Sequence, residues 1–152
     1  MNIIPSKKKN LGSKEDVKRL SKIFSNAGVP NDETASFFVI LRGAFVQDNL
    51  ANFLEELDES QINTLREENS KLLKRKQEKE SQDLLLALFK EATGQDIYEF
   101  SEKSVYEFSG TLLDEIEKNK TEVSKDFFDS LVGIFSTWLN NSTARIMEIL
   151  YQ

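Results

Sequence analysis

One segment restricts the possible folds more than any other: residues 58–94, with the sequence DESQINTLREENSKLLKRKQEKESQDLLLALFKEATG. It opens with Asp58 and Gln61, a capping box in which each side chain accepts a hydrogen bond from the other residue's backbone amide. Gly94 suits the left-handed conformation that commonly ends a helix. Leucine-rich stripes with helical spacing lie near both ends. The segment therefore predicts one long helix over residues 58–93, the central element of an all-α chain.

The middle of this helix, residues 74–83, carries only polar side chains. A helix without an apolar face depends on charge pairs along its own surface, each worth a few tenths of a kcal/mol. Three pairs have the required spacing of four residues: Glu67 with Lys71, Lys74 with Glu78, and Lys76 with Glu80. The alternative is a solvated hinge over residues 74–83 between two helices, the second of them capped by Ser81.

A continuous helix of this length would measure about 50 Å, whereas a compact chain of this size has a radius of gyration of about 15 Å. One end would protrude, and the commonest partner for a protruding apolar end is a second copy of the chain. The segment thus predicts a homodimer. The candidate partner-binding residues on it are Leu72, Leu73, Leu85 and Phe89.

Asn69 allows two interpretations. In a heptad pattern that starts at Ile62 it occupies an a position, where asparagine can fix the register of a dimeric coiled coil. The apolar seam lasts only about two heptads, however, so a bundle helix with an incidental asparagine explains the pattern equally well.

Four further helices are predicted around this segment. A capping box at residues 13–16 starts the first of them, which ends before Pro30. Another capping box, at residues 96–99, starts the fourth helix in chain order. Thr121 or Ser124 can cap the last helix, whose apolar spacing is the clearest in the chain.

Residues 31–57 carry two apolar faces, one in the first half and one in the second half, and the two point in nearly opposite directions. Either both faces are buried, as in a central helix, or the chain breaks near Asp48, which would cap a new helix. We favour the central helix. The whole chain is then a bundle of about five helices in a single domain over residues 13–152, preceded by a flexible basic tail over residues 1–12.

The chain contains no cysteine and no histidine. This removes disulfides, the thiolate and imidazole metal ligands, and the usual general base. Carboxylates cluster beside a helix start at residues 55–59, where the helix dipole favours them without any catalysis. We therefore predict a protein that is not an enzyme and has no catalytic residue, cofactor or metal ligand. The lack of cysteine is compatible with a reducing compartment, and we expect a cytoplasmic location.

A net charge of −6 opposes binding to nucleic acid and to anionic lipid. The apolar run at residues 37–46 includes Arg42 and is far shorter than a membrane span, so no membrane contact is expected. Nucleic-acid binding remains the alternative function, as a regulator that uses the basic tail and the basic cluster at residues 71–79. Its candidate phosphate contacts are Lys7, Lys8, Lys9, Lys74, Arg75 and Lys76.

The chain contains eleven phenylalanines, more than one buried face of each helix requires. Large aromatic side chains supply much of the binding energy of protein interfaces. Phe127 lies off the main apolar face of the last helix and is the best single candidate for such a contact. The sequence thus favours a non-enzymatic protein-interaction module that acts as an adaptor, inhibitor, chaperone or regulator.

Overall fold

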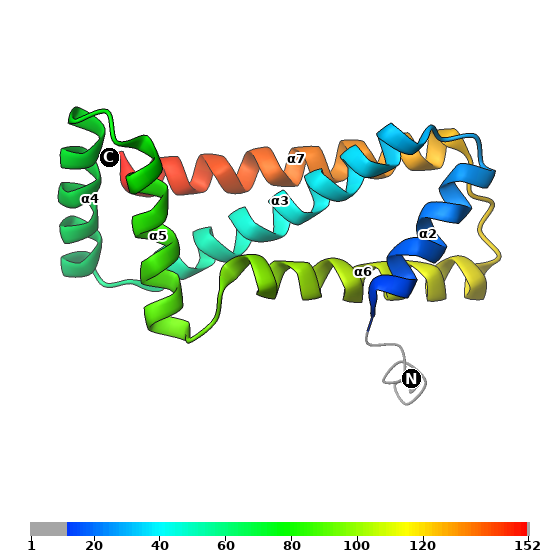
Figure 1. Ribbon diagram of the computed structural model, residues 1–152, viewed down its shortest axis with the longest axis horizontal. Coiled ribbons are helices and arrows are strands. Elements are labelled where there is room, and N and C mark those ends of the chain that lie inside the picture. The colour runs from blue at the N-terminus through cyan, green and yellow to red at the C-terminus, as the bar shows by residue number, and fades with distance from the viewer. Residues whose placement is uncertain (1–11, 152) are drawn as a thin grey trace.

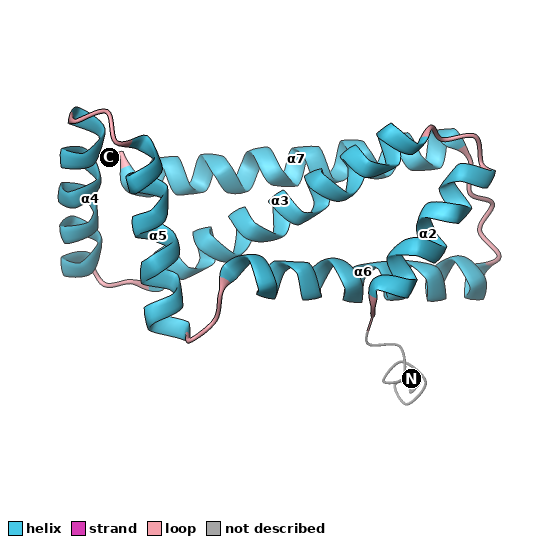
Figure 2. Ribbon diagram, viewed as in Figure 1, coloured by secondary structure: helices cyan, strands magenta, loops and turns pink. Residues whose placement is uncertain are grey.

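The computed structural model describes residues 12–151. These residues form six α-helices and no strand (Figures 1 and 2). The predicted all-α bundle is therefore confirmed. The helices are α2 (Lys14–Asn26), α3 (Asn31–Glu56), α4 (Glu59–Lys74), α5 (Glu78–Thr93), α6 (Ile97–Asn119) and α7 (Lys125–Leu150).

The bundle is elongated along α3 and α7, which lie side by side and run in the same direction (Figure 1). Lys125 pairs with Glu33 at the start of both helices, at an Nζ–Oε1 distance of 3.0 Å. Arg145 pairs with Asp48 at 3.1 Å and with Glu55 at 2.5 Å near their ends. Helix α6 packs on α3 in the opposite direction, α2 packs on α3 and α6 at one end, and α4 and α5 form a hairpin at the other end.

Helix α3 buries its two apolar faces in two separate cores. Phe37 and Leu41, in its first half, are fully buried in a core with α2, α6 and α7. Leu50 and Leu54, in its second half, are buried in a core with α4, α5 and α7. The preferred interpretation of residues 31–57 as one central helix is confirmed, because the reversal of its apolar face matches a change of neighbours halfway along it.

The prediction of a continuous helix over residues 58–93 is wrong. Helix α4 ends at Lys74, and Lys76 adopts a left-handed conformation with φ of 58°. The amide of Gln77 donates to the carbonyl of Leu72 at 2.8 Å, and the amide of Lys76 donates to that of Leu73 at 3.0 Å. This pair of hydrogen bonds is a Schellman motif, which closes a helix end. The long helix in the middle of the fold is α3 instead.

The break has a physical reason in the polar residues themselves. None of the three predicted charge pairs forms; Lys71 instead pairs with Glu68 and Lys79 with Asp83. Such exposed pairs contribute only a few tenths of a kcal/mol. Turning the chain lets the apolar residues of α4 and α5 pack on each other and on α3 and α7. A fully buried apolar side chain, such as that of Leu65 or Phe89, contributes about 1.5–3 kcal/mol.

Asn69 and Ser81 join the two arms of the hairpin. Both side chains are buried, and the Ser81 hydroxyl donates to Oδ1 of Asn69. Asn69 therefore has a partner inside its own chain, which removes the reason to assign it to a coiled-coil register. Ser81 does not cap α5, because Gln77 occupies that position and Ser81 lies within the helix.

We expect Lys76→Gly to stabilise the protein by about 0.5–1 kcal/mol, because glycine adopts the left-handed conformation without the steric cost of a Cβ atom. Chemical unfolding measures the change. A continuous helix would instead lose about 1 kcal/mol on gaining an interior glycine, so the sign of the effect tests the break. Lys71→Gly, at an exposed position within α4, is the matched control and should be destabilising.

Candidate protein-binding groove

A groove of about 600 Å³ lies between α3, α5 and α7 and reaches the start of α6. Its floor is formed where α3 and α7 meet. There the side-chain amide of Gln47 donates a hydrogen bond to the Thr143 hydroxyl at 3.2 Å. Gly43 on α3 faces Leu139 on α7. The other lining residues are Val39, Arg42, Val46, Leu50, Ser81, Gln82, Leu85, Leu86, Tyr98, Ile146, Met147, Leu150 and Tyr151.

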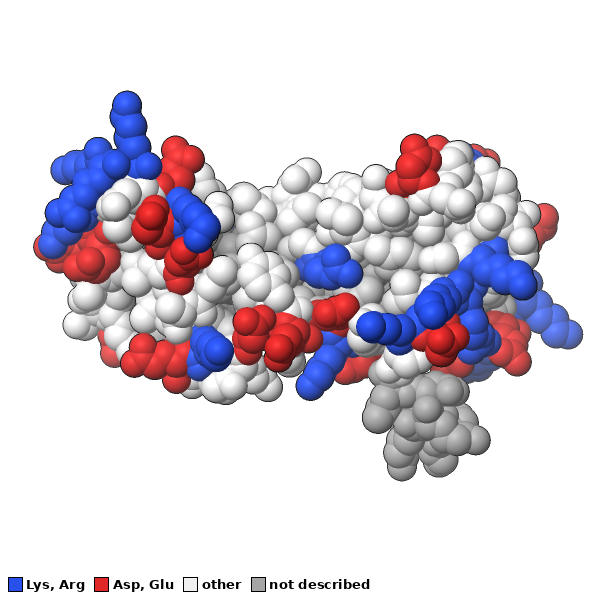
Figure 3. All heavy atoms as spheres, in the orientation of Figure 1, with Lys and Arg blue, Asp and Glu red and all other residues white. Residues whose placement is uncertain are grey.

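The groove presents large apolar side chains to solvent. Val39 is 64% exposed, Tyr98 53%, Met147 51% and Tyr151 51%. Figure 3 shows that charged side chains gather over the α4–α5 hairpin and along α2 and α6, whereas the surface over α7 and the middle of α3 is largely uncharged. The sequence explains this, since residues 130–144 of α7 contain no charged residue. Contiguous apolar surface of this kind commonly marks a site of interaction.

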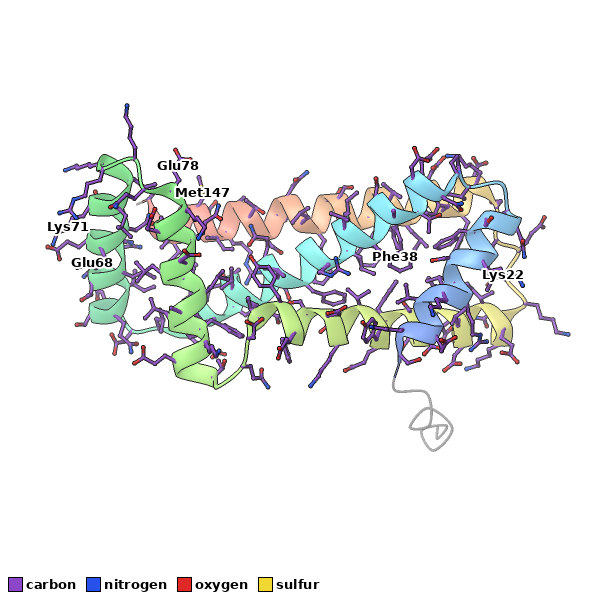
Figure 4. All side chains as sticks on the ribbon, in the orientation of Figure 1. Lys22, Phe38, Glu68, Lys71, Glu78 and Met147 are labelled. Carbon is purple, nitrogen blue, oxygen red and sulfur yellow. The ribbon has the colours of Figure 1, made fainter. Side chains whose placement is uncertain are left out.

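Helix α5 forms one wall of the groove because local contacts fix its position. Ser81, which lines the groove, is held by Asn69 of α4. At the other end, Gly94 adopts φ of 74° and ends α5, which turns the chain into α6 and leaves Tyr98 at the groove. Figure 4 shows Met147 of α7 beside α5.

Arg42 is the only charged residue among those that line the groove. It is half-buried, and no described residue forms an ion pair or a side-chain hydrogen bond with it. Nearby on α6, the Tyr106 hydroxyl donates to the Glu102 carboxylate at 2.7 Å. This hydrogen bond, with burial, raises the pKa of Tyr106, and the charge of Arg42 partly opposes the rise.

Arg145, which is not among the residues that line the groove, is by contrast fully paired. Its guanidinium donates to Asp48 at 3.1 Å, to Asn52 at 2.7 Å and to Glu55 at 2.5 Å, all on α3. The hydrogen bond from Arg145 holds the pKa of the Glu55 carboxyl below its ordinary value. The two arginines thus differ in that one has its partners within the chain and the other has none among the described residues.

The predicted partner-binding residues lie in different places. Leu85 lines the groove. Phe89 is only 5% exposed and packs edge-to-face against Phe53 in the second core. Leu72 is half-buried, and Leu73, also half-buried, lines a separate shallow hollow between α4 and the end of α7. Phe127 is half-buried and outside both core clusters; its contact with a partner stays a prediction.

Sequence reasoning missed Val39, Tyr98 and Met147. Val39 lies within residues 31–57, which we predicted to be one helix with both of its apolar faces buried. Tyr98 and Met147 each follow a buried isoleucine near a helix end, and their own exposure depends on how the helices are placed around them. No local pattern marks these residues as part of one surface.

The residues predicted to contact nucleic acid are only partly described. Lys74, Arg75 and Lys76 are exposed at the α4–α5 turn and form no ion pair with another described residue, and basic side chains gather there in Figure 3. The neighbouring Lys71, labelled in Figure 4, is paired with Glu68. The predicted sites Lys7, Lys8 and Lys9 lie outside the described residues. Nucleic-acid binding therefore stays a prediction.

Within residues 12–151, no three carboxylates come together in an arrangement that could hold a metal ion. No helix in the same range combines the length and the apolar character needed to cross a membrane. No protein-family model, curated protein or solved structure matches the chain.

Proposed function

We propose that this protein is a non-enzymatic interaction module that binds a partner protein in the groove between α3, α5 and α7. The observation that carries the proposal is the set of large apolar side chains, Val39, Tyr98 and Met147, that are more than half exposed around one groove. Covering them with a partner removes apolar surface from water and contributes about 25 cal/mol per Å². Methionine also adapts its shape readily, which suits a binding surface.

The groove suits roles in which one protein holds another: adaptor, inhibitor, chaperone or regulator. A homodimer is the form of this proposal in which the partner is a second copy. The sequence predicted a homodimer from a protruding helix over residues 58–93. That argument no longer applies, because the segment folds back as a hairpin. The groove is the surface that replaces it, and light scattering over a range of concentrations distinguishes a dimer from a monomer.

A selection from a random library of 16-residue peptides displayed on phage tests the groove directly. Peptides enriched on the wild-type chain should bind Met147→Glu about tenfold more weakly or worse. The substitution places a carboxylate where the groove otherwise makes apolar contacts with the peptide. Ile134→Glu is the matched control. Ile134 is 60% exposed on the same helix but does not line the groove, so this variant should bind the same peptides as the wild type does.

Fluorescence anisotropy with labelled peptides measures both affinities, and circular dichroism checks that each variant is folded. Equal losses of peptide affinity for the two variants, or no loss of affinity for Met147→Glu, would show that the peptides do not bind in this groove. A selection that enriches no peptide would also count against the proposal.

A further inference from the structure

Arg42 determines what can cover the groove. It is the only charged residue in the lining, and no described residue forms an ion pair with it. An occupant that covered it with apolar atoms alone would leave a buried charge without a partner, which is strongly unfavourable. A carboxylate is the most suitable partner, because its two oxygens match the planar guanidinium and form two parallel hydrogen bonds.

The dimensions of the groove suit a short helix. The lining residues extend over twelve residues along α3, from Val39 to Leu50, and over twelve along α7, from Leu139 to Leu150, which is eleven steps along each helix. At 1.5 Å per residue this is about 16 Å, or three turns of helix. Helices that bind in grooves use apolar side chains at positions i, i+3, i+4 and i+7, which cover about two turns of one face.

A helix fits the exposure of the groove better than a small molecule does. Sites for small ligands enclose most of the ligand surface. Here Val39, Tyr98 and Met147 are each more than half exposed, so the groove is open along one side. A helix needs only one covered face and keeps its other face in solvent.

We propose that the partner is an amphipathic helix of about three turns whose apolar face carries one Asp or Glu that pairs with Arg42. This inference rests on the proposed function, since it identifies the chemistry of the partner that the groove binds. The acidic residue gives specificity to an otherwise apolar contact, because a helix with a neutral or basic residue at that position would leave Arg42 unpaired.

The same phage selection, repeated on Arg42→Gln, tests the inference. Peptides enriched on the wild-type chain should share one acidic residue within an apolar i, i+3, i+4, i+7 pattern, and those enriched on Arg42→Gln should lack that preference. For one enriched peptide, Glu→Gln (or Asp→Asn) should weaken binding to the wild type by about tenfold, the effect of a charged hydrogen bond. The same peptide change should have little effect on binding to Arg42→Gln.

Arg145→Gln is the matched control for Arg42→Gln. It removes an arginine that is already paired and does not line the groove, so the acidic preference should persist. If the acidic and neutral peptides bind the wild type equally, while Met147→Glu still abolishes binding, the groove proposal stands and the carboxylate inference is wrong. If Met147→Glu has no effect, the groove proposal is wrong as well.

A fatty acid is the alternative carboxylate for this site. Oleate is therefore added to the wild-type complex with the enriched peptide. Displacement of the peptide by oleate at a comparable concentration would assign the groove to a lipid and overturn the helix inference. Retention of the peptide supports the helix.

Discussion

Replacing Phe37 with alanine is expected to lower the free energy of unfolding by about 3–5 kcal/mol, the largest change we predict for a single substitution. Phe37 is fully buried at the meeting point of α2, α3 and α7. Its ring lies 5.7 Å from that of Phe24, 5.2 Å from Phe38, 5.6 Å from Phe128 and 6.1 Å from Phe135. Removal of the ring ends its four aromatic contacts. It also leaves a cavity, because helices this closely packed relax only in part to fill the space.

Phe127→Ala is the control for this experiment. It removes the same ring from a position that is half-buried and outside both core clusters. Phe127→Ala should therefore lower the free energy of unfolding by much less than Phe37→Ala does. Unfolding in denaturant, followed by circular dichroism, measures both. A similar loss for the two variants would contradict the placement of Phe37 at the centre of the first core.

Leu54→Ala should lower the free energy of unfolding by about 2–5 kcal/mol. Leu54 is 1% exposed in the second core, near the end of α3 that contacts the hairpin. The decrease in the free energy of unfolding should be large because the substitution removes most of the van der Waals contacts that the buried side chain makes. Leu57→Ala, a half-buried leucine just after α3, is the control and should cost less.

The combination of Phe37→Ala and Leu54→Ala shows whether the two cores unfold together. The residues are 17 positions apart on one helix, about 25 Å, so their effects should add to within about 0.5 kcal/mol. Because α3 contributes to both cores, we expect a single cooperative transition in each variant. Two separate transitions would show that the hairpin end unfolds independently of the rest.

Helix starts and ends could be predicted from the sequence where neighbouring residues determine them. The Asp58 and Gln61 capping box forms with hydrogen bonds of 2.8 and 3.0 Å. Ser124 caps α7 through the amide of Phe127 at 3.1 Å, and Gly94 ends α5 in the left-handed conformation. These features involve partners at most three or four residues apart, so the local sequence is sufficient to predict them.

The sequence left open a break at residues 75–77, as a hinge over residues 74–83, but gave no reason to prefer it to a continuous helix. The polar segment satisfies helical spacing and offers charge pairs, and no glycine or proline interrupts it. The free energy that favours the turn comes from packing α5 against α3, α4 and α6, which no local pattern contains. For the same reason Asn69 could be assigned to a coiled coil from sequence, although its partner is Ser81, twelve residues away.

The sequence by itself determined that the chain is all-helical and where most helices begin, and it favoured one helix with two buried faces over residues 31–57. These properties follow from the periodicity of apolar residues and from hydrogen bonds between near neighbours. Only the tertiary structure decided that residues 58–93 fold back and that Val39, Tyr98 and Met147 surround one groove beside Arg42, with which no described residue forms an ion pair. Exposure of a side chain depends on which helices cover it, and that is set by the sum of long-range packing energies rather than by the residues next to it in the chain.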